Sequence, residues 1–132
     1  MILKICKIII PLTPVPWCAH GGYGRRSYNK RSKEKAVYVD MLKTAWKIQS
    51  IYGAVRLSFI FNMPIPKSYS EKKRQSLIGQ YHTKRPDTSN LIKFTEDCLK
   101  GIAFADDSQV SELKATKRYA IKGSVEIEIE EI

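Results

Sequence analysis

The sequence predicts a single domain of the α+β (mixed α/β) class, in which helices pack on a mixed β-sheet of about four strands. Two observations lead to this prediction. Apolar residues recur at a spacing of two in some segments and of three to four in others, which indicates both strands and helices. The length, 132 residues, and a hydrophobic content of 43% fit one domain (1–132) with a buried core. The expected order of elements is β-α-β-α-α-β-β.

The first part of the chain predicts a strand, a loop and a long helix. Residues 3–10 are rich in β-branched side chains and predict a strand that ends at Pro11. The glycine-containing residues 17–30 predict a loop. A helical pattern begins near Ser32, a suitable N-cap, and continues to Gly53, a suitable C-terminal stop.

The middle of the chain predicts one strand and two helices. Residues 54–61 alternate between apolar and other side chains, which is typical of a strand with one buried face. Ser70 is a suitable cap for a short helix at 71–77, and a longer helix at 88–100 is expected to end at Gly101. The buried face of that longer helix is expected to comprise Leu91, Ile92, Phe94, Thr95, Cys98 and Leu99.

Two strands are expected to end the chain. They cover residues 110–120 and 124–132, and residues 121–123 predict a short hairpin turn between them. In the last strand, valine and isoleucine alternate with glutamate. The apolar side chains are therefore expected to face the core and the carboxylates to face outward.

The chain is strongly basic. Lys and Arg total 23 against 13 Asp and Glu, so the formal net charge is +10. Such a charge attracts polyanions, of which nucleic acid is the commonest, while an anionic membrane surface is the alternative. Two basic segments also contain tyrosines, a mixture typical of DNA contacts. The residues expected to contact DNA are Arg25, Arg26, Lys30, Arg31, Lys72, Lys73, Arg74, Lys84 and Arg85.

No targeting or membrane segment is visible in the sequence. The apolar start of the chain is interrupted by Lys4 and Lys7, and no run approaches the roughly 20 apolar residues of a membrane span. The cysteines Cys6, Cys18 and Cys98 are odd in number and widely spaced, which favours reduced thiols. We therefore expect a cytoplasmic protein with no membrane partner.

Carboxylates at both ends of the helix predicted at 88–100 form the candidate chemical site. Asp87 precedes the helix, Asp106 and Asp107 follow it, and Lys93 lies one turn inside it on the polar side. Each also has an ordinary structural interpretation, as a helix cap, a solvated turn and a surface lysine respectively. Together they predict a divalent metal beside a phosphate, with Lys93 stabilising the negative charge that develops there.

The length of this helix limits a shared metal site. A helix over 88–100 is about 20 Å long, so it alone would hold Asp87 and Asp107 apart. Residues 102–107 can extend over roughly 20 Å. The sequence therefore permits the two aspartates to meet only if this connection folds back along the helix.

The joined motif consists of Arg85-Pro86-Asp87-Thr88-Ser89-Asn90-Leu91, Lys93 and Asp106-Asp107-Ser108-Gln109-Val110. It resembles the RusA family of Holliday junction resolvases, which are common in bacteria and their prophages. The family pattern is an Asp-x-Asp-Asn-Leu segment, a lysine three residues after the Asn and, further along, an Asp-Asp-x-Gln-Val segment. The opening strand with its prolines, the basic loop and the lysine-rich short helix also fit this family, so the resemblance spans most of the chain.

The resemblance implies a small homodimeric endodeoxyribonuclease that binds four-way DNA junctions and nicks two opposed strands with Mg²⁺ or Mn²⁺. Asp87 and Asp107 match metal-binding aspartates, and Asp106 lies beside them in the motif. Lys93 matches the catalytic lysine. Asn90 and Gln109 match further motif positions. The expected role is resolution of branched DNA in recombination and repair, for a bacterial protein of phage or prophage origin.

Ser89 is the departure from the family pattern, because it stands where the second metal-binding aspartate is expected. A hydroxyl is a poor ligand for a hard cation, which prefers carboxylate oxygens. Asp106, His82 or water is expected to complete the metal shell. Two alternatives remain open: a junction-binding protein with weakened or lost nuclease activity, and an RNA-binding or ribosome-associated basic protein.

Overall fold

A computed structural model of the protein describes residues 3–19, 21–23, 26–28 and 31–132. The main sheet has four strands in the order β1-β6-β4-β5. β6 pairs antiparallel with both β1 and β4, whereas β4 and β5 are parallel. The predicted mixed sheet is thus confirmed. The strands are β1 (Ile5–Ile10), β4 (Val55–Pro64), β5 (Val110–Ala120) and β6 (Ser124–Glu131).

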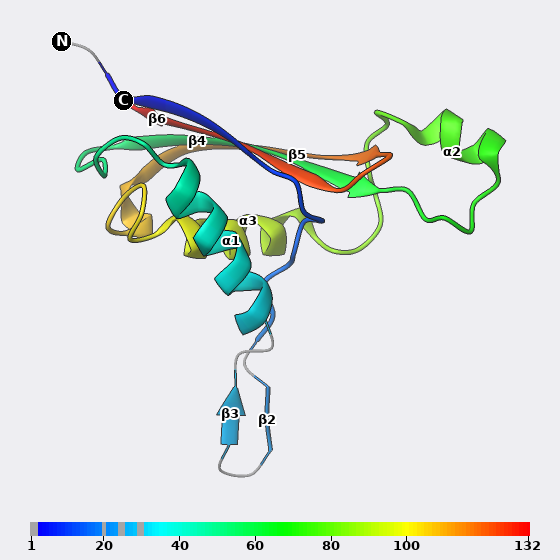
Figure 1. Ribbon diagram of the computed structural model, residues 1–132, viewed down its shortest axis with the longest axis horizontal. Coiled ribbons are helices and arrows are strands. Elements are labelled where there is room, and N and C mark those ends of the chain that lie inside the picture. The colour runs from blue at the N-terminus through cyan, green and yellow to red at the C-terminus, as the bar shows by residue number, and fades with distance from the viewer. Residues whose placement is uncertain (1–2, 20, 24–25, 29–30) are drawn as a thin grey trace.

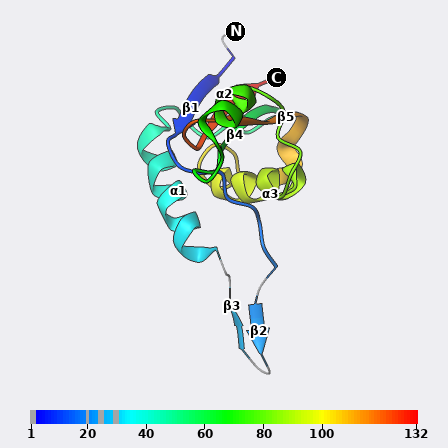
Figure 2. The same ribbon diagram turned by 90° about the vertical axis from the view of Figure 1, so that its right-hand side faces the viewer.

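Two helices cover one face of this sheet, and within the described residues no helix lies on the other face (Figures 1 and 2). They are α1 (Ser32–Ala45) and α3 (Thr88–Leu99). The short helix α2 (Glu71–Leu77) lies beyond the end of the sheet, and the Ser70 side chain caps it by accepting from the Lys73 amide, as predicted. None of the helices in the described part of the chain is long and apolar enough to span a membrane.

The core lies between the sheet and these two helices. α3 buries the predicted face, except that Ile92 is only half-buried. The Tyr38 ring of α1 meets the Phe94 ring of α3 edge to face, with 5.2 Å between the ring centroids. The predicted alternation in β4 is confirmed, because its inward residues are almost fully buried: Val55, Leu57, Phe59 and Phe61.

A second sheet occupies part of the loop predicted at residues 17–30. β2 (Gly21–Tyr23) pairs antiparallel with β3 (Arg26–Tyr28), and this hairpin projects away from the main sheet (Figure 1). Each strand is three residues long, which is too short for a recognisable alternation of side chains. The prediction of an irregular loop was therefore wrong for these residues.

α1 ends at Ala45, well before the predicted stop at Gly53. Trp46 already has extended backbone, with φ −76° and ψ 111°. The chain leaves the helix because Ile51 is fully buried and its amide donates to the Ala103 carbonyl at 2.7 Å. A tertiary contact therefore overrides the helical periodicity of this segment.

The start of α1 also differs from the prediction. Arg31 occupies the N-cap position, and Ser32 is the first helical residue. No side chain caps this end, and an ion pair of 3.6 Å between Arg31 and Glu34 lies across the first turn. The acidic Glu34 near the helix N-terminus is itself favourable, so the helix can begin without a serine cap.

The last two strands do not form the predicted hairpin. β4 lies between β5 and β6, so residues 121–123 cross the end of β4. β4 itself continues to Pro64, beyond the predicted end at Phe61. The crossing passes close to the chain after β1, since a Cβ atom on Gly123 would lie 2.7 Å from the Thr13 Cα. The apolar β4 is thus the inner strand, paired on both sides, and sequence adjacency does not decide which strands pair.

Candidate functional site

Residues 79–86 lie along the outer edge of β5 and lead to Asp87 at the start of α3. An unpaired sheet edge is a site for association with other chains, and this segment occupies the edge at residues 117–119. Backbone hydrogen bonds of 2.9 to 3.0 Å hold it there, and they join Gly79, Gln80 and His82 to Tyr119 and Lys117. The position of Asp87 is therefore set by β5 as well as by α3.

Asp87 occupies the N-cap position of α3, but its carboxylate makes no capping hydrogen bond. Only its backbone carbonyl serves the helix, by accepting from the Leu91 amide at 3.2 Å. The residue is exposed. Asp87 therefore does not cap the helix through its carboxylate, and this carboxylate is available to a ligand.

A surface hollow of about 360 Å³ opens beside Asp87. The Trp17 amide donates to the Asn90 carbonyl at 2.8 Å, which fixes the chain before β2 against the first turn of α3. The Lys93 Nζ atom lies 3.5 Å from the centroid of the Trp17 ring, a cation–π contact. The hollow is lined by Pro16, Trp17, Cys18, Arg31, Arg85, Pro86, Asp87 and Asn90.

Trp17 therefore connects Lys93 to the residues around Asp87. Nothing in the sequence predicts this role, because Trp17 is far from Lys93 along the chain and belongs to no recognised motif. The only signal is an isolated tryptophan between the prolines and the basic loop. Arg31 and Arg85, both predicted to contact DNA, line the same hollow.

Asp106 and Gln109 stabilise the turn that precedes β5. Asp106 Oδ1 accepts from the Ser108 amide at 2.9 Å, and Gln109 Oε1 accepts from the Asp106 amide at 3.0 Å. Gln109 Nε2 donates to the carbonyls of Ile51 and Gly53 at 2.8 and 3.0 Å. Both motif residues therefore have a structural role in this turn, which contains the 3₁₀ helix η1 (Asp107–Gln109).

Asp107 differs from its neighbour because one of its carboxylate oxygens has no partner. The residue is half-buried, and Oδ1 is buried without a hydrogen-bond donor among the described residues. Burial, and then the negative charge of Asp107, raise the pKa of the Glu96 carboxyl in the third turn of α3. A buried carboxylate oxygen without a donor costs stability, so Asp107 is a residue that a cation or an external donor would satisfy.

Asp87 and Asp107 lie at opposite ends of α3, which has 12 residues and is about 18 Å long. The connection after the helix does not return along it. The Gly101 amide donates to the Phe104 carbonyl at 2.7 Å, and Phe104 is fully buried beside Ile51. The described residues contain no group of three or more His, Cys, Asp and Glu side chains arranged to hold a metal ion. One chain therefore does not bring the two aspartates together.

His82 and Ser89 are the other candidates for the metal shell. Ser89 is exposed in the first turn of α3. The His82 ring packs against Tyr119 with 4.6 Å between centroids, and its Nδ1 atom is buried without a partner in the described part of the chain. Burial, followed by the charge of Lys117, lowers the pKa of His82. The ring is thus neutral at neutral pH, which is the form that binds metals.

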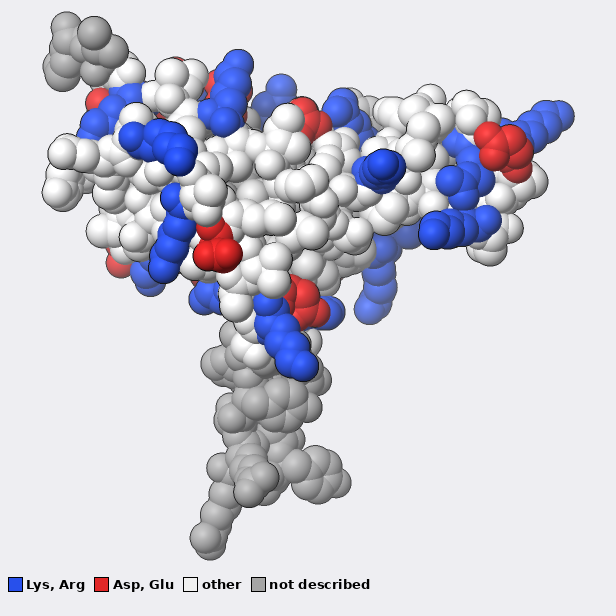
Figure 3. Space-filling model, viewed as in Figure 1, with Lys and Arg blue, Asp and Glu red and all other residues white. Residues whose placement is uncertain are grey.

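Basic side chains gather around α2, at the end of the molecule beyond the sheet (Figure 3). The Lys73 Nζ atom lies 3.9 Å from the centroid of the Tyr69 ring, and Lys84 Nζ donates to the Tyr69 hydroxyl at 3.1 Å. The described residues offer no carboxylate partner to the five predicted DNA contacts of this region, namely Lys72, Lys73, Arg74, Lys84 and Arg85.

Three of the predicted DNA contacts are not tested in this way. Arg25 and Lys30 lie outside the described residues, and for Arg26 only the backbone in β3 is described. Among the basic residues predicted in and next to this loop, Arg31 alone has a described side chain, and it lines the hollow beside Asp87. The positions of the other three basic side chains stay predictions.

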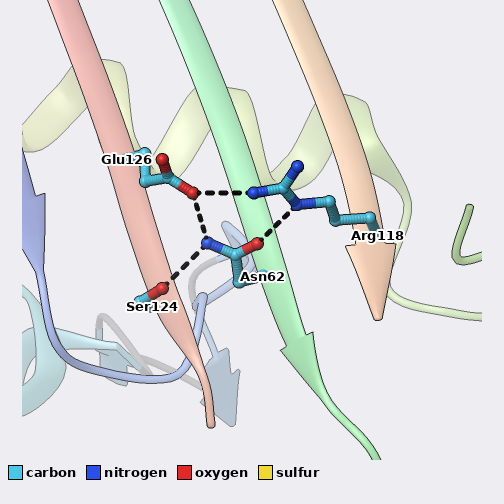
Figure 4. Close-up of polar contacts among 4 residues, drawn as sticks. All are labelled: Asn62, Arg118, Ser124 and Glu126. Atoms are coloured by element: carbon cyan, nitrogen blue, oxygen red, sulfur yellow. Dashed lines mark hydrogen bonds and ion pairs between the residues drawn. The ribbon is translucent and has the colours of Figure 1, made fainter. Parts of the chain in front are cut away.

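On the uncovered face of the main sheet, Arg118 and Glu126 are already paired (Figure 4). Asn62 Nδ2 donates to Ser124 Oγ at 2.9 Å and to Glu126 Oε2 at 2.7 Å. Arg118 Nε donates to Asn62 Oδ1 at 2.9 Å, and another guanidinium nitrogen lies 3.1 Å from Glu126 Oε2. This network crosses three strands and closes on itself.

A second group on the same face is neutralised in the same way. Arg56 of β4 pairs with Glu112 of β5 and, at 2.9 Å, with Glu130 of β6. Glu126 and Glu130 of the last strand thus compensate cations of the neighbouring strands. Arg56 and Arg118 of this face are therefore neutralised, whereas the basic side chains near α2 have no carboxylate partner among the described residues and keep a positive charge that attracts DNA.

Comparison with known proteins identifies one family. The family model described as Endodeoxyribonuclease RusA matches residues 17–130. YqaN of Bacillus subtilis (strain 168), described as an uncharacterized protein, is 31% identical over 107 residues, which are 77% of this chain and 75% of YqaN. The crossover junction endodeoxyribonuclease rusA of Lactococcus phage r1t is 31% identical over 110 residues, which are 78% of this chain and 84% of the phage protein.

The family match extends well beyond the motif around Asp87 and includes the helices α1, α2 and α3, the strands β4 and β5 and most of β6, but not β1. The family model begins at Trp17, which contacts Lys93, and ends within β6. The chain therefore belongs to the RusA endodeoxyribonuclease family.

Proposed function

We propose that this protein is a metal-dependent endodeoxyribonuclease that resolves Holliday junctions and related branched DNA by phosphodiester hydrolysis, in DNA recombination and repair. One observation carries the proposal: an exposed, uncapped Asp87 carboxylate lies beside a hollow lined by Arg31 and Arg85, with Lys93 held nearby by Trp17. The family match and the phage relative named as a crossover junction endodeoxyribonuclease support branched DNA as the substrate. The phage relative also supports a phage or prophage origin.

The residues around the hollow have separate roles in this proposal. Arg31 and Arg85 bind phosphate oxygens of the DNA backbone, for which the guanidinium group is well suited. Lys93 stabilises the negative charge that develops on the scissile phosphate. Lys93 is exposed, and its ammonium group lies against Trp17, which lines the hollow. The Asn90 side chain offers a donor and an acceptor at the same wall.

The basic residues near α2 hold the arms of the DNA. Contacts from lysine and arginine to phosphates fix the orientation of DNA but carry no sequence information. Recognition of the junction therefore depends on its shape more than on its sequence. On the uncovered sheet face, Arg56 and Arg118 are already paired with glutamates and therefore contribute less to holding DNA.

We propose Mg²⁺ or Mn²⁺ as the cofactor, with Asp87 as a carboxylate ligand. Mg²⁺ keeps several waters and uses one or two carboxylates together with substrate phosphates, so an exposed carboxylate beside an arginine-lined hollow fits it. When bound, the ion lowers the pKa of a coordinated water and neutralises charge on the scissile phosphate. His82 and Asp106 are proposed as further contributors to the shell.

We propose that the protein acts as a homodimer, in which Asp107 of one protomer and Asp87 of the other serve the same metal site. The supporting observations are the positions of these aspartates at opposite ends of α3 and the unpartnered Oδ1 of Asp107. A two-fold dimer also matches the two-fold symmetry of a four-way junction and the need to nick two opposed strands.

A cleavage assay tests the function directly. The protein is expected to nick a synthetic four-way junction with Mg²⁺ or Mn²⁺, to lose this activity with a chelator, and to leave a linear duplex of the same sequence intact. Absence of metal-dependent cleavage by the wild-type protein, under conditions where it binds the junction, would contradict the proposal. Equal cleavage of the linear duplex would contradict the junction as substrate.

Ser89 favours a second candidate function, a junction-binding protein with weak or no nuclease activity. Ser89 is exposed in the first turn of α3, two residues after Asp87, and a hydroxyl is a poor ligand for Mg²⁺. This candidate predicts tight junction binding that weakens steeply with salt, without metal-dependent cleavage.

Replacement of Ser89 by aspartate tests the role of this residue. We expect Ser89→Asp to increase the rate of metal-dependent nicking by about 10-fold, because a carboxylate joins Asp87 near the positive end of the helix dipole. Nicking rates at several Mg²⁺ concentrations measure the effect. Ser111→Asp, the same substitution at an exposed position of β5, is the matched control. An unchanged rate in Ser89→Asp, with normal metal binding, would show that serine does not limit cleavage.

A further inference from the structure

Lys117 is a lysine of β5 whose side chain is engaged at the start of α3. It is half-buried, and its Nζ atom donates to the Lys84 carbonyl at 2.5 Å and to the Pro86 carbonyl at 2.7 Å. Both acceptors belong to the segment that leads into Asp87. One ammonium group thus joins the sheet to the residue immediately before Asp87.

This contact lies beyond the last backbone hydrogen bond between the segment and β5. The backbone hydrogen bonds between this segment and β5 reach from Gly79 to His82, where the His82 amide donates to the Lys117 carbonyl at 3.0 Å. From there to Asp87, the Lys117 side chain continues the attachment to the sheet. Pro86 has no amide hydrogen and cannot donate to the sheet itself.

Lys117 also interacts with the Asp87 carboxylate. Burial lowers the pKa of Lys117. The negative charge of Asp87 acts in the opposite direction and raises this pKa, but by less than burial lowers it. The ammonium group therefore both attaches the backbone before Asp87 and lies within the electrostatic reach of its side chain. Lys93, by contrast, is exposed and contacts the aromatic face of Trp17.

We propose that Lys117 is a positioning residue, which fixes the Asp87 carboxylate relative to Lys93 and the hollow. This inference rests on the proposed nuclease function for its kinetic consequences, but not for its structural ones. A metal-binding carboxylate must be held within a fraction of an ångström of its productive position, and the residues behind it supply that constraint. Lys117 is the residue that supplies it here.

The test compares Lys117→Met with Lys114→Met. Methionine keeps the length of the side chain but removes its charge and donors, and Lys114 is an exposed lysine on the opposite face of the same strand. We expect Lys117→Met to lower kcat for junction nicking by about 10- to 100-fold and to raise the Mg²⁺ concentration needed for half-maximal rate. The KM for the junction and its Kd should be unchanged, and Lys114→Met should behave as wild type.

A second measurement needs neither DNA nor metal. In nitrogen relaxation experiments, the amides of Arg85 and Asp87 should have order parameters near 0.85 in the wild type and below about 0.6 in Lys117→Met. Lys117→Arg, which keeps charge and donors, should restore rigidity and most of the rate. If Lys117→Met does not fold, Lys117→Gln takes its place.

The outcomes distinguish a failure of the nuclease proposal from a failure of the proposed role of Lys117. If the wild-type protein does not cleave, the nuclease proposal fails, while the order parameters still decide the role of Lys117. Unchanged order parameters in Lys117→Met would overturn the inference, even if kcat fell. An unchanged kcat with a loosened segment would overturn the link between this contact and catalysis.

Discussion

Replacement of Asp87 by asparagine is expected to abolish metal-dependent nicking of a four-way junction, with a loss of about 100- to 1,000-fold in kcat. The carboxylate is exposed and makes no capping hydrogen bond, so it contributes little to the fold. Asparagine has the same shape but is neutral, and it is a weaker ligand for a hard cation. The expected loss is therefore a loss of chemistry and not of structure.

The measurement combines three readouts for Asp87→Asn: nicking rate, junction Kd and thermal unfolding. Kd and the midpoint of unfolding should match those of the wild type, because the DNA contacts and the core are unchanged. Asp40→Asn, which makes the same charge change at an exposed position of α1, serves as control and should cut normally. Cleavage by Asp87→Asn at the wild-type rate would contradict the role of this carboxylate.

The sequence predicts the core elements of this fold because their signals are local. The alternation in β4 and the apolar face of α3 each follow from the period of one element, and both are confirmed. The errors occur where a distant contact decides. α1 ends at Ala45 because Ile51 is buried against the turn after α3, and β5 and β6 are separated by β4 although they are neighbours in sequence.

The residues of the candidate site also divide into those that a local sequence signal indicates and those that only a distant contact brings in. Asp87, Lys93 and Asp107 are candidates from the motif alone, because their spacing along the chain matches the family pattern, and their roles stay a proposal. Trp17 and Lys117 are not, because their relation to Lys93 and Asp87 exists only after folding. The separation of Asp87 from Asp107 was open in the sequence, since the connection after α3 was long enough to return. The Phe104 side chain enters the core instead, and the connection leads directly to β5.

A mixture of two inactive variants is expected to recover activity that neither has alone. Asp87→Asn and Asp107→Asn homodimers should each be inactive, because each lacks a carboxylate in both metal sites. If one site takes Asp87 from one protomer and Asp107 from the other, a mixed dimer has one site with both carboxylates and one site with neither. Random pairing of equal amounts yields roughly half mixed dimers, so nicking should return to about a quarter of the wild-type rate.

The form of the product gives a sharper readout than the rate. On a supercoiled plasmid that carries a cruciform, the wild-type dimer should cut two opposed strands and produce linear DNA, whereas a mixed dimer with one intact site should stop at nicked circles. Co-expression with two affinity tags isolates the mixed dimer. The double variant Asp87→Asn/Asp107→Asn, paired with wild type, is the control. Its mixed dimer has one carboxylate in each site and should be inactive.

The same experiment would also rule out a shared site if each protomer forms a complete site by itself. When each protomer supplies its own complete site, the Asp87→Asn and Asp107→Asn pair has no intact site, and the double variant paired with wild type retains one. The two arrangements therefore predict opposite results for the two mixtures. Asp87 and Asp107 are separated along α3, and one Asp107 oxygen has no partner among the described residues. Both observations favour nicking activity in the first mixture and no activity in the second.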